Sequence, residues 1–428
     1  MRIGIIGAGV SGLVASWLLH EAHEVVLFER NDYLGGHAHT LTVQHEGCSV
    51  AVDTAFQHFS HQLYPTFVRL LELLGVPLRR VPISATFYAR GQAKAEGKSL
   101  LMPPPLNLRD LRPAALATLL QLRHTLIMAS ELDTTDDWST TVGEFIDGLR
   151  LTGSFKSEFL VPFVTALLGT SMADSRRMSA RAALRYPVHH QPASPLRPFE
   201  FLEVEGGVTS YVQVLAAQLT RAEVRLGARI ESVRREGGRY LVQDGASTHV
   251  FDQLIIAAPA RDAAVLLRGL AGSERLQETL GSIEYIETRI AIHSDPSLLP
   301  PQRSTWSACN MTYDGQACEF SMWPGRHAGV NVFKSWITHR STTPRALHRL
   351  YRYFHPLMTP DYFRAQTRLA RHQGEAGLWL AGSYSQDIDS HESGVRSAIA
   401  VAERLLPQSN FLRLAAPESA PARWRRAS

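Results

Sequence analysis

The sequence predicts an α/β protein in which a three-layer domain built on a parallel sheet is interleaved with an α+β domain. Three observations lead to this prediction. A strand, a glycine-rich turn, a helix and a second strand follow one another at 3–29, another strand, turn and helix lie at 378–405, and strand-like and helical stretches alternate between them. The 428 residues are enough for two domains of ordinary size.

The first unit opens with the apolar run Ile3–Ile6, which is typical of a buried strand. Gly7–Gly12 then forms a turn, Leu13–His20 has the spacing of a helix, and Glu24–Glu29 is a second buried strand. Glycines interrupt the apolar run and no small-residue cleavage site follows, which argues against a secretory signal. We therefore predict a β-α-β unit of the Rossmann type.

The G-x-G-x-x-G spacing of Gly7, Gly9 and Gly12 predicts a dinucleotide site at this turn. Gly7 allows the tight turn, Gly9 lets the backbone approach a diphosphate, and Gly12 lets the helix pack closely on the strand. The diphosphate would lie at the helix N-terminus, where free N–H groups and the helix dipole favour negative charge. Glu29 ends the second strand, where it can accept the ribose hydroxyls of an adenosine. The alternative is a glycine-rich turn that only packs.

The composition excludes several classes of protein. With 45% hydrophobic and 20% charged residues, the chain is neither disordered nor fibrous. The net charge of +4 is the difference between 44 basic and 40 acidic side chains, so no nucleic-acid partner is expected. The apolar stretch Pro113–Ser130 is interrupted by Arg123 and His124, which predicts no membrane span but leaves room for a peripheral membrane contact. Three cysteines without C-x-x-C spacing favour the cytoplasm and argue against disulfide or metal frameworks.

A second glycine pair follows the first unit, in the stretch Tyr33–His37. It resembles the E-x-x-x-x-x-G-G-[RH] extension of FAD enzymes. The chain is similar to the flavin-containing amine oxidase superfamily, which includes protoporphyrinogen oxidase and phytoene desaturase, and within it to a bacterial branch of predicted NAD/FAD-binding oxidoreductases. The matching stretches are IGIIGAGVSGL, LFERNDYLGGHAHT, VAVDTAFQHFSHQLYPTFVRLLELLGV, FLVPFVTALLGT, VEGGVTSYVQVLAAQL, FDQLIIAAPA and LWLAGSYSQDIDSHESGVRSAIAVAERL.

The resemblance implies an amine-oxidase-like fold with a Rossmann-type FAD-binding domain and non-covalently bound FAD. The cofactor-binding positions that we predict are Gly7, Gly9, Gly12, Glu29, Arg30, Gly35, Gly36, His37, Thr54, Ala55, Phe56, Ile230, Gly382, Ser383, Gly394 and Val395. Two of them depart from the family pattern. Ser383 stands where an acidic residue usually holds the flavin ribityl chain or phosphate, although its hydroxyl can still hydrogen-bond. Ala55 stands beside the flavin ring where many relatives have glycine.

The second strand-turn-helix unit lies near the end of the sequence. Leu378–Ala381 has the pattern of a strand, Gly382 is the turn, and Gly394–Leu405 has the spacing of an amphipathic helix. A helix N-terminus at Ser393–Val395 would point backbone donors at an electron-rich group, which the resemblance identifies as the pyrimidine carbonyl region of the flavin. The alternative is an ordinary C-terminal helix.

The two domains are expected to interleave along the chain. We predict an FAD-binding domain at 1–80, 200–268 and 370–408, a substrate domain at 81–199 and 269–369, and a disordered tail at 409–428. Further predicted elements are a helix at Thr209–Leu219 and strands at Val224–Val233, Phe251–Pro259, Glu287–His293 and Gly329–Ile337.

Candidates for chemistry are fewer, because flavin enzymes leave electron transfer to the cofactor. Four histidines lie in segments expected near the flavin, with a spacing that matches no metal motif: His37, His39, His58 and His61. Such histidines act as general bases or bond to phosphate or backbone, and we expect His37 to contact the cofactor. Tyr384, Phe56 and Trp336 are aromatic candidates for the pocket wall or the core.

Lys334 is the one candidate catalytic side chain, in the predicted strand Asn331–Trp336. It is one of only four lysines in a chain that otherwise uses arginine: Lys94, Lys98, Lys156 and Lys334. The resemblance to amine oxidases implies a lysine that holds a water near flavin N5. The alternative is an exposed lysine on a strand, because lysines are mostly surface residues.

The substrate is expected to be small and lipophilic. The helical stretch Leu106–Leu132 is apolar enough to wall a greasy channel, to lie on a membrane interface, or to form a buried core helix. The resemblance implies hydride transfer to FAD from fatty acyl, isoprenoid or polyketide substrates, in desaturation, oxidation or isomerisation. Two alternatives are an amine oxidase that produces peroxide and a non-catalytic prenyl-chain carrier of the GDP-dissociation-inhibitor kind.

Overall fold

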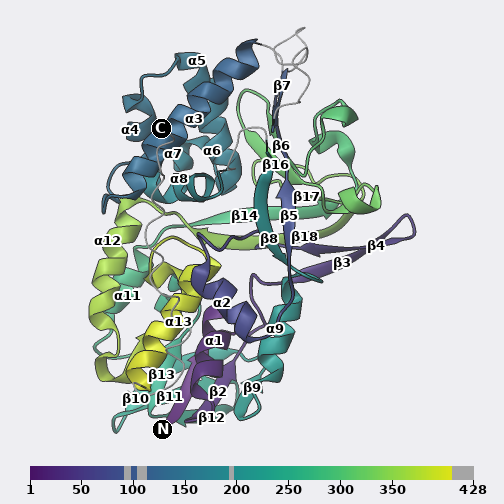
Figure 1. The fold of residues 1–428 in the computed structure, drawn as a ribbon. Coiled ribbons are helices and arrows are strands. Elements are labelled where there is room, and N and C mark those ends of the chain that lie inside the picture. The colour runs from purple at the N-terminus through teal and green to yellow at the C-terminus, as the bar shows by residue number, and fades with distance from the viewer. Residues whose placement is uncertain (91–97, 104–112, 192–196, 407–428) are drawn as a thin grey trace.

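The computed structural model describes residues 1–90, 98–103, 113–191 and 197–406. A parallel sheet and its covering helices occupy the lower half of the molecule in Figure 1, and a mostly antiparallel sheet and a group of helices occupy the upper half. The tail predicted at 409–428 and the first part of the helix predicted at Leu106–Leu132 lie outside the described residues.

The lower half is organised around a five-stranded parallel sheet with the order β19-β13-β1-β2-β9. Its strands are β1 (Arg2–Ile6), β2 (Glu24–Phe28), β9 (Ala222–Arg225), β13 (Gln253–Ile256) and β19 (Leu378–Leu380). The strands predicted at the two ends of the sequence therefore belong to one sheet. Ile255 of β13 pairs with Ile5 on one side and with Trp379 on the other.

Two further layers cover this sheet. Ile3 and Ile5 face one core, which contains the helices α1 (Val10–Leu19), α2 (Pro65–Leu73), α9 (Val208–Ala217) and α13 (His391–Leu405). Ile6 and Phe28 face the other core, together with Phe251 and the antiparallel sheet β10 (Ile230–Glu236), β11 (Arg239–Asp244) and β12 (Ser247–Phe251). This arrangement confirms the predicted three-layer α/β fold.

Two predicted strands of this half were wrong in their extent. The prediction Val224–Val233 covers β9 and β10, which belong to different sheets and are separated by a turn at Gly227, where φ is +68°. The prediction Phe251–Pro259 likewise runs from the end of β12 through β13. Apolar residues stand on both sides of Gly227 and of Asp252, so periodicity does not reveal the turns between the strands.

The upper half contains a seven-stranded sheet with the order β18-β14-β17-β16-β15-β6-β7. Its strands are β6 (Ala85–Ala89), β7 (Lys98–Met102), β14 (Tyr285–His293), β15 (Cys309–Tyr313), β16 (Cys318–Met322), β17 (Phe333–Trp336) and β18 (Leu347–Pro356). The strand predicted at Gly329–Ile337 begins only at Phe333, because a short 3-10 helix at Pro324–Ala328 ends at Gly329 with φ +71°.

Two antiparallel pairs complete the sheets. β3 (Thr40–His45) and β4 (Cys48–Asp53) form a projecting hairpin, and β5 (Leu78–Ile83) pairs with β8 (Phe199–Val204). Two of the predicted domain limits, near 80 and 200, fall inside the β5–β8 ladder, where the chain passes between the two halves. The domain boundaries themselves stay a prediction.

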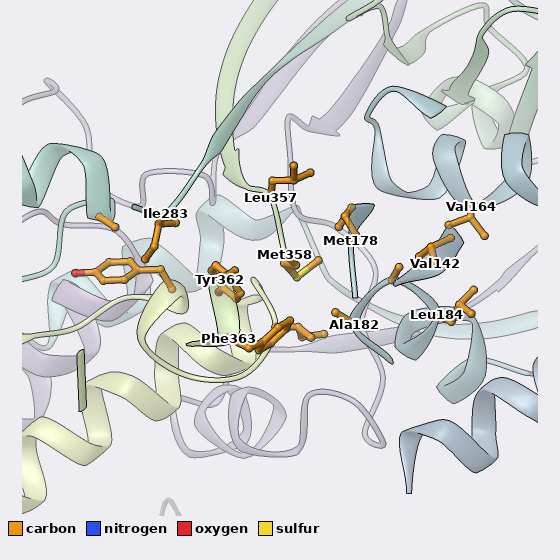
Figure 2. Packing of buried hydrophobic residues seen from close by; sticks show 14 of the residues in the cluster. Val142, Val164, Met178, Ala182, Leu184, Ile283, Leu357, Met358, Tyr362 and Phe363 are labelled. Carbon is orange, nitrogen blue, oxygen red and sulfur yellow. The ribbon is translucent and has the colours of Figure 1, made fainter. Parts of the chain in front are cut away.

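The remaining helices lie in the upper half, at the seam between the halves and along the side of the lower half (Figure 1). They are α3 (Pro113–Asp133), α4 (Val142–Gly148), α5 (Gly153–Phe155), α6 (Val161–Leu168), α7 (Met172–Arg177), α8 (Ala180–His189), α10 (Ala260–Leu266), α11 (Glu274–Gly281) and α12 (Pro360–Leu369), with a π-helical turn at Lys156–Leu160. Of these, α10 and α11 lie along the side of the lower half, where α11 contacts α12. Figure 2 shows Tyr362 and Phe363 of α12 in one apolar cluster with Ala182 of α8 and Val142 of α4. Among the described residues, no helix is long and apolar enough to cross a membrane.

Candidate active site

The glycine-rich turn between β1 and α1 has the geometry that its spacing predicts. Gly7 has φ +106°, a conformation that side chains disfavour. A Cβ on Gly12 would lie 1.8 Å from the backbone oxygen of Gly7, so only glycine lets α1 pack this closely on the turn. A Cβ on Gly9 would meet nothing within 4 Å, which leaves this backbone open to a ligand.

Glu29 follows β2 and lies beside this turn. Its buried carboxylate accepts a hydrogen bond from Ala8 N through Oε2 at 2.8 Å. Its Oε1 accepts two bonds from Asn31, at 3.0 Å from the backbone and 2.7 Å from the side chain. Since each carboxylate oxygen has two lone pairs, Oε2 keeps one for a ribose hydroxyl.

The second glycine pair lies directly against the first motif. Gly35 N donates to Ala8 O at 2.9 Å, and a Cβ on Gly36 would approach Gly9 Cα to 3.2 Å. The two glycine motifs, which the sequence separates by a helix and a strand, therefore form one backbone surface. Because these glycines have no side chains, a diphosphate can approach their backbone closely.

Two other predicted positions lie at the margin of this surface. Arg30 is exposed and forms an ion pair with Asp262 at 3.4 Å. Ile230 begins β10, just after Ala228 N donates to Glu29 O at 2.9 Å. The structure thus brings Ile230 close to the acidic end of β2 and turns Arg30 toward solvent.

The segment that follows β4 meets the seven-stranded sheet through Lys334. The Lys334 ammonium is fully buried, so the alternative of an exposed strand lysine is wrong. Its Nζ donates to Asp53 O at 2.8 Å, to Ala55 O at 3.3 Å and to the Gln57 side-chain oxygen at 3.1 Å. Burial lowers the pKa of Lys334 to about 8, and the Asp53 carboxylate opposes this shift.

A charged network lies behind this lysine. Glu203 on β8 accepts hydrogen bonds from Gln57 at 3.1 Å, from His58 at 2.7 Å and from Arg79 at 2.6 Å. Burial raises the pKa of Glu203, but the bonds from His58 and Arg79 outweigh it and lower the pKa to about 2. His58 is thus bound to a carboxylate, whereas His61 is exposed.

A second polar network surrounds Ser383, where the family pattern expects an acid. The Ser383 hydroxyl donates to the Asp389 carboxylate, which also pairs with His355 Nδ1 at 3.1 Å. Burial raises the pKa of Asp389, but the bond from His355 outweighs it and holds this pKa below its usual value. An acidic residue six positions further along the chain therefore reaches the Gly382–Ser383 turn.

His37 lies next to this network. Its ring is 5.2 Å from that of His355 and 4.7 Å from that of Tyr353, edge to face. Burial lowers the pKa of His37 to about 4, so its ring is neutral at pH 7. Thr54 joins the same group, because its hydroxyl shares a 2.5 Å hydrogen bond with Tyr353 OH. His39 is close by, and burial lowers its pKa as well.

The N-terminus of α13 differs from its prediction. The helix begins at His391, not at Ser393–Val395, because Ser390 is the N-cap and accepts from Ser393 N at 3.1 Å. The Gly394 N–H donates to Ser390 O at 3.0 Å, and Val395 is buried in the core. The free N–H groups of the first turn therefore begin at His391 and Glu392.

Gly394 lies at a close contact between two helices. A Cβ at this position would lie 2.7 Å from Val10 Cγ1, so Gly394 allows α13 to approach α1. His391 is the new candidate at this helix end. It stacks on Phe56 with ring centroids 3.8 Å apart, and its buried Nε2 has no hydrogen-bond partner within the described residues. Burial lowers the pKa of His391 to about 3.

The three aromatic candidates have different surroundings. Phe56, which belongs to the 53–57 segment, packs with Phe59 and Tyr64. Trp336 lies in cation-π range of Lys334, 5.2 Å from Nζ to the ring centroid. Tyr384 is buried against the Gly382 turn, and its hydroxyl has no partner among the described residues.

These features fit an FAD molecule. Gly9 and Gly36 offer open backbone, Glu29 keeps a free acceptor position, and His391 has a buried ring nitrogen without a partner at a helix start. The donor and acceptor groups lie on elements that meet at the carboxyl ends of β1, β2 and β19, where ligands bind in open α/β sheets. The site thus suits a dinucleotide.

Comparisons with known proteins agree with this geometry. The family model of flavin containing amine oxidoreductases matches residues 10–332. The fold is similar to cyclohexylamine oxidase from Brevibacterium oxydans IH-35A, with 16% identity, a TM-score of 0.64, and coverage of 94% of this chain and 99% of that one. It is also similar to the CLA-producing fatty acid isomerase from P. acnes, with 13% identity, a TM-score of 0.67, and coverage of 95% and 98%.

A curated sequence relative matches only a short stretch. An uncharacterised protein from Methanocaldococcus jannaschii is 61% identical over 36 residues, which are 8% of this chain and 9% of that protein. The family model, in contrast, spans most of the chain. The glycine motifs, the Glu29 carboxylate and the parallel sheet have the arrangement with which Rossmann folds bind a dinucleotide. The chain therefore belongs to the flavin containing amine oxidoreductase family, as an oxidoreductase that depends on FAD.

Proposed function

We propose that this oxidoreductase removes a hydride from a carbon of a small lipophilic substrate, in a desaturation, oxidation or isomerisation of a fatty acyl, isoprenoid or polyketide chain. The observation that carries the proposal is the hydrogen bonding of the charged groups around the 53–57 segment. The ammonium of Lys334 and the carboxylates of Asp53 and Glu203 are all bound to protein partners. A substrate with a charged group next to the reacting carbon would have to displace one of these bonds, whereas an apolar hydrocarbon segment would not.

The surfaces beside the same segment are aromatic. Phe56 stacks on His391 and contacts Tyr64 at 5.6 Å between ring centroids. Two residues after Lys334, the ring of Trp336 lies 5.0 Å from that of Phe320. Aromatic walls with few free polar groups are typical of sites for apolar ligands.

FAD, when bound, supplies the acceptor for the hydride. The residues of the chain then have binding and positioning roles. The backbone around Gly9 and Gly36 and the Glu29 carboxylate would hold the dinucleotide, and His37 and His391 would remain neutral at pH 7 because burial lowers the pKa of both. No general base with a pKa near 7 is needed for hydride removal itself.

The named relatives support two substrate classes. The P. acnes protein is named as a fatty acid isomerase and the B. oxydans protein as an amine oxidase, and both share this fold. The Asp53 and Glu203 carboxylates near Lys334 are already bound to protein partners, which favours a fatty acyl substrate over an amine for this chain. An amine oxidase that produces peroxide is the alternative, and a prenyl-chain carrier is a further one that would not need FAD.

An anaerobic spectroscopic titration tests the proposal. The purified protein is expected to show the bands of oxidised flavin, to release FAD on heating or with acid, and to bleach when a long-chain fatty acid or an isoprenoid alcohol is added. Bleaching by cyclohexylamine or putrescine alone, followed by peroxide formation in air, would overturn the lipid assignment. Protein that stays colourless after reconstitution with FAD would contradict both enzyme functions and leave the prenyl-chain carrier as the remaining hypothesis.

A matched variant controls for unspecific bleaching. Gly12→Val places a side chain where a Cβ alone comes within 1.8 Å of Gly7 O, so this variant should not form the cofactor turn. We expect it to contain no FAD and to give no spectral change with any substrate. A spectral change in this variant would show that the signal does not come from the site.

A further inference from the structure

The ammonium of Lys334 has no hydrogen left for a water. It donates three hydrogen bonds, to Asp53 O at 2.8 Å, to Ala55 O at 3.3 Å and to Gln57 Oε1 at 3.1 Å. An ammonium group has three N–H donors and no acceptor, so three oxygens match its protonated form. A neutral amine would direct its lone pair at one of these oxygens. The arrangement therefore favours a charged lysine that is bound only by protein.

One of the three acceptors is a side chain, and that side chain is itself fixed. Gln57 Nε2 donates to Glu203 Oε1 at 3.1 Å. The same carboxylate is held by His58 and by two bonds from Arg79, at 2.6 and 3.0 Å. With its amide nitrogen on a carboxylate and its oxygen on an ammonium, Gln57 has a single favourable orientation.

We propose that Gln57 is a positioning residue that holds Lys334 as a fixed, protonated cation on the 53–57 segment, and that Glu203 in turn orients Gln57. This inference rests on the proposed function, in which that segment lies beside the flavin. It differs from the role that the resemblance implies for the lysine. Here the amide oxygen of Gln57 takes the place that a water would occupy.

Several groups face the Lys334 ammonium and determine its charge. The Asp53 carboxylate approaches from β4, the Cys309 thiol from β15 and the Glu203 carboxylate from β8, and each of them raises the pKa of Lys334. Burial has the largest effect and lowers this pKa to about 8. Because the pKa of Lys334 lies close to neutral pH, the loss or gain of one charged or hydrogen-bonding neighbour changes the fraction of Lys334 that is protonated at pH 7.

The small number of lysines makes this charge measurable. The chain has four lysines, so the holoenzyme labelled with [15N]lysine gives at most four Nζ resonances. Lys334→Met identifies the resonance of the buried ammonium. In the wild-type protein we expect this resonance to titrate with a midpoint near pH 8, as the pKa of about 8 implies.

Two substitutions at Gln57 should move this midpoint in opposite directions. Gln57→Glu, combined with Glu203→Gln so that two carboxylates do not lie 3.1 Å apart, puts a carboxylate beside the ammonium and should raise the midpoint by about one pH unit or more. Gln57→Met removes the third acceptor and should lower it, so that the lysine is partly neutral at pH 7. Gln44→Met, on the exposed β3–β4 hairpin, is the control and should leave it unchanged. Equal midpoints in the wild type and both Gln57 variants would overturn the inference.

The outcomes separate this inference from the proposed function. Gln57→Glu preserves the shape of the side chain, so it keeps the test informative if Gln57→Met does not fold. A shifted Lys334 midpoint in a holoenzyme that no lipid bleaches would support the positioning role and contradict the lipid substrate. Bleaching by a lipid with unshifted midpoints would contradict the positioning role alone.

Discussion

Gly394 is the point where α13 approaches α1, and a methyl group at this position should weaken the contact. A Cβ on Gly394 would lie 2.7 Å from Val10 Cγ1, while ordinary contact begins at 3.4 Å, so the neighbours must yield by 3.4 − 2.7 = 0.7 Å. Overpacking costs ~1–3 kcal/mol, whereas alanine gains ~0.5–1 kcal/mol over glycine inside a helix. We therefore expect Gly394→Ala to lower the free energy of unfolding by about 1–2 kcal/mol.

Urea unfolding followed by tryptophan fluorescence measures this loss, and a double-mutant cycle identifies its cause. Val10→Ala removes the methyl groups that the new Cβ would meet, so the double variant should be more stable than the sum of the single effects by about 1 kcal/mol. Gly148→Ala at the end of α4 is the control, since a Cβ there meets nothing within 4 Å. Additive effects of Val10→Ala and Gly394→Ala, or a fully stable Gly394→Ala, would refute the reasoning.

Three further predictions concern charge. Burial lowers the pKa of His391 from 6.5 to about 3, so the stability that this residue contributes is complete above pH 6.5 and is lost as the pH falls. His391→Phe should remove up to ~1.4 kcal/mol per pH unit of acid sensitivity from unfolding curves between pH 7 and 4, and an unchanged slope would contradict this. Lys334→Met leaves three oxygens without their donor and should lower the free energy of unfolding by about 3 kcal/mol or more. Lys156→Met on the surface is the control and should lower it little. Thermal unfolding of both variants measures the difference. Glu29→Gln should weaken FAD binding roughly tenfold, because hydrogen bonds to a charged acceptor contribute ~1.5–3 kcal/mol; equal affinity in fluorescence titrations of the apoprotein would contradict a ribose contact.

The parts of the fold that could be predicted are those with local signals. Gly7, Gly9 and Gly12 stand at fixed spacing between two apolar runs, so strand, turn and helix can be recognised within a few dozen residues. The same holds for the strand before Gly382. The helix after it was placed three residues too late, because the N-cap Ser390 lies in a run of polar residues that has no hydrophobic period.

The networks of the site could not be predicted, because they join residues that are distant in the sequence. Glu203 reaches Gln57 from β8, and Asp389 reaches His355 on β18, a strand that the sequence analysis did not identify. The burial of Lys334 likewise depends on the sheet around it. The only local signal was the rarity of lysine in a chain rich in arginine.

The order of the parallel sheet has a consequence for how the protein is made. Strand β19 and helix α13 leave the ribosome last among the described elements, yet β19 pairs with β13, and α13 packs on α1, the first described helix. Until about residue 405 has been synthesised, the apolar face of α1 lacks this cover and the sheet lacks its edge strand. The first strands and helices therefore cannot complete their sheet and core until these last partners have been synthesised, and we expect their apolar surface to be exposed for most of translation.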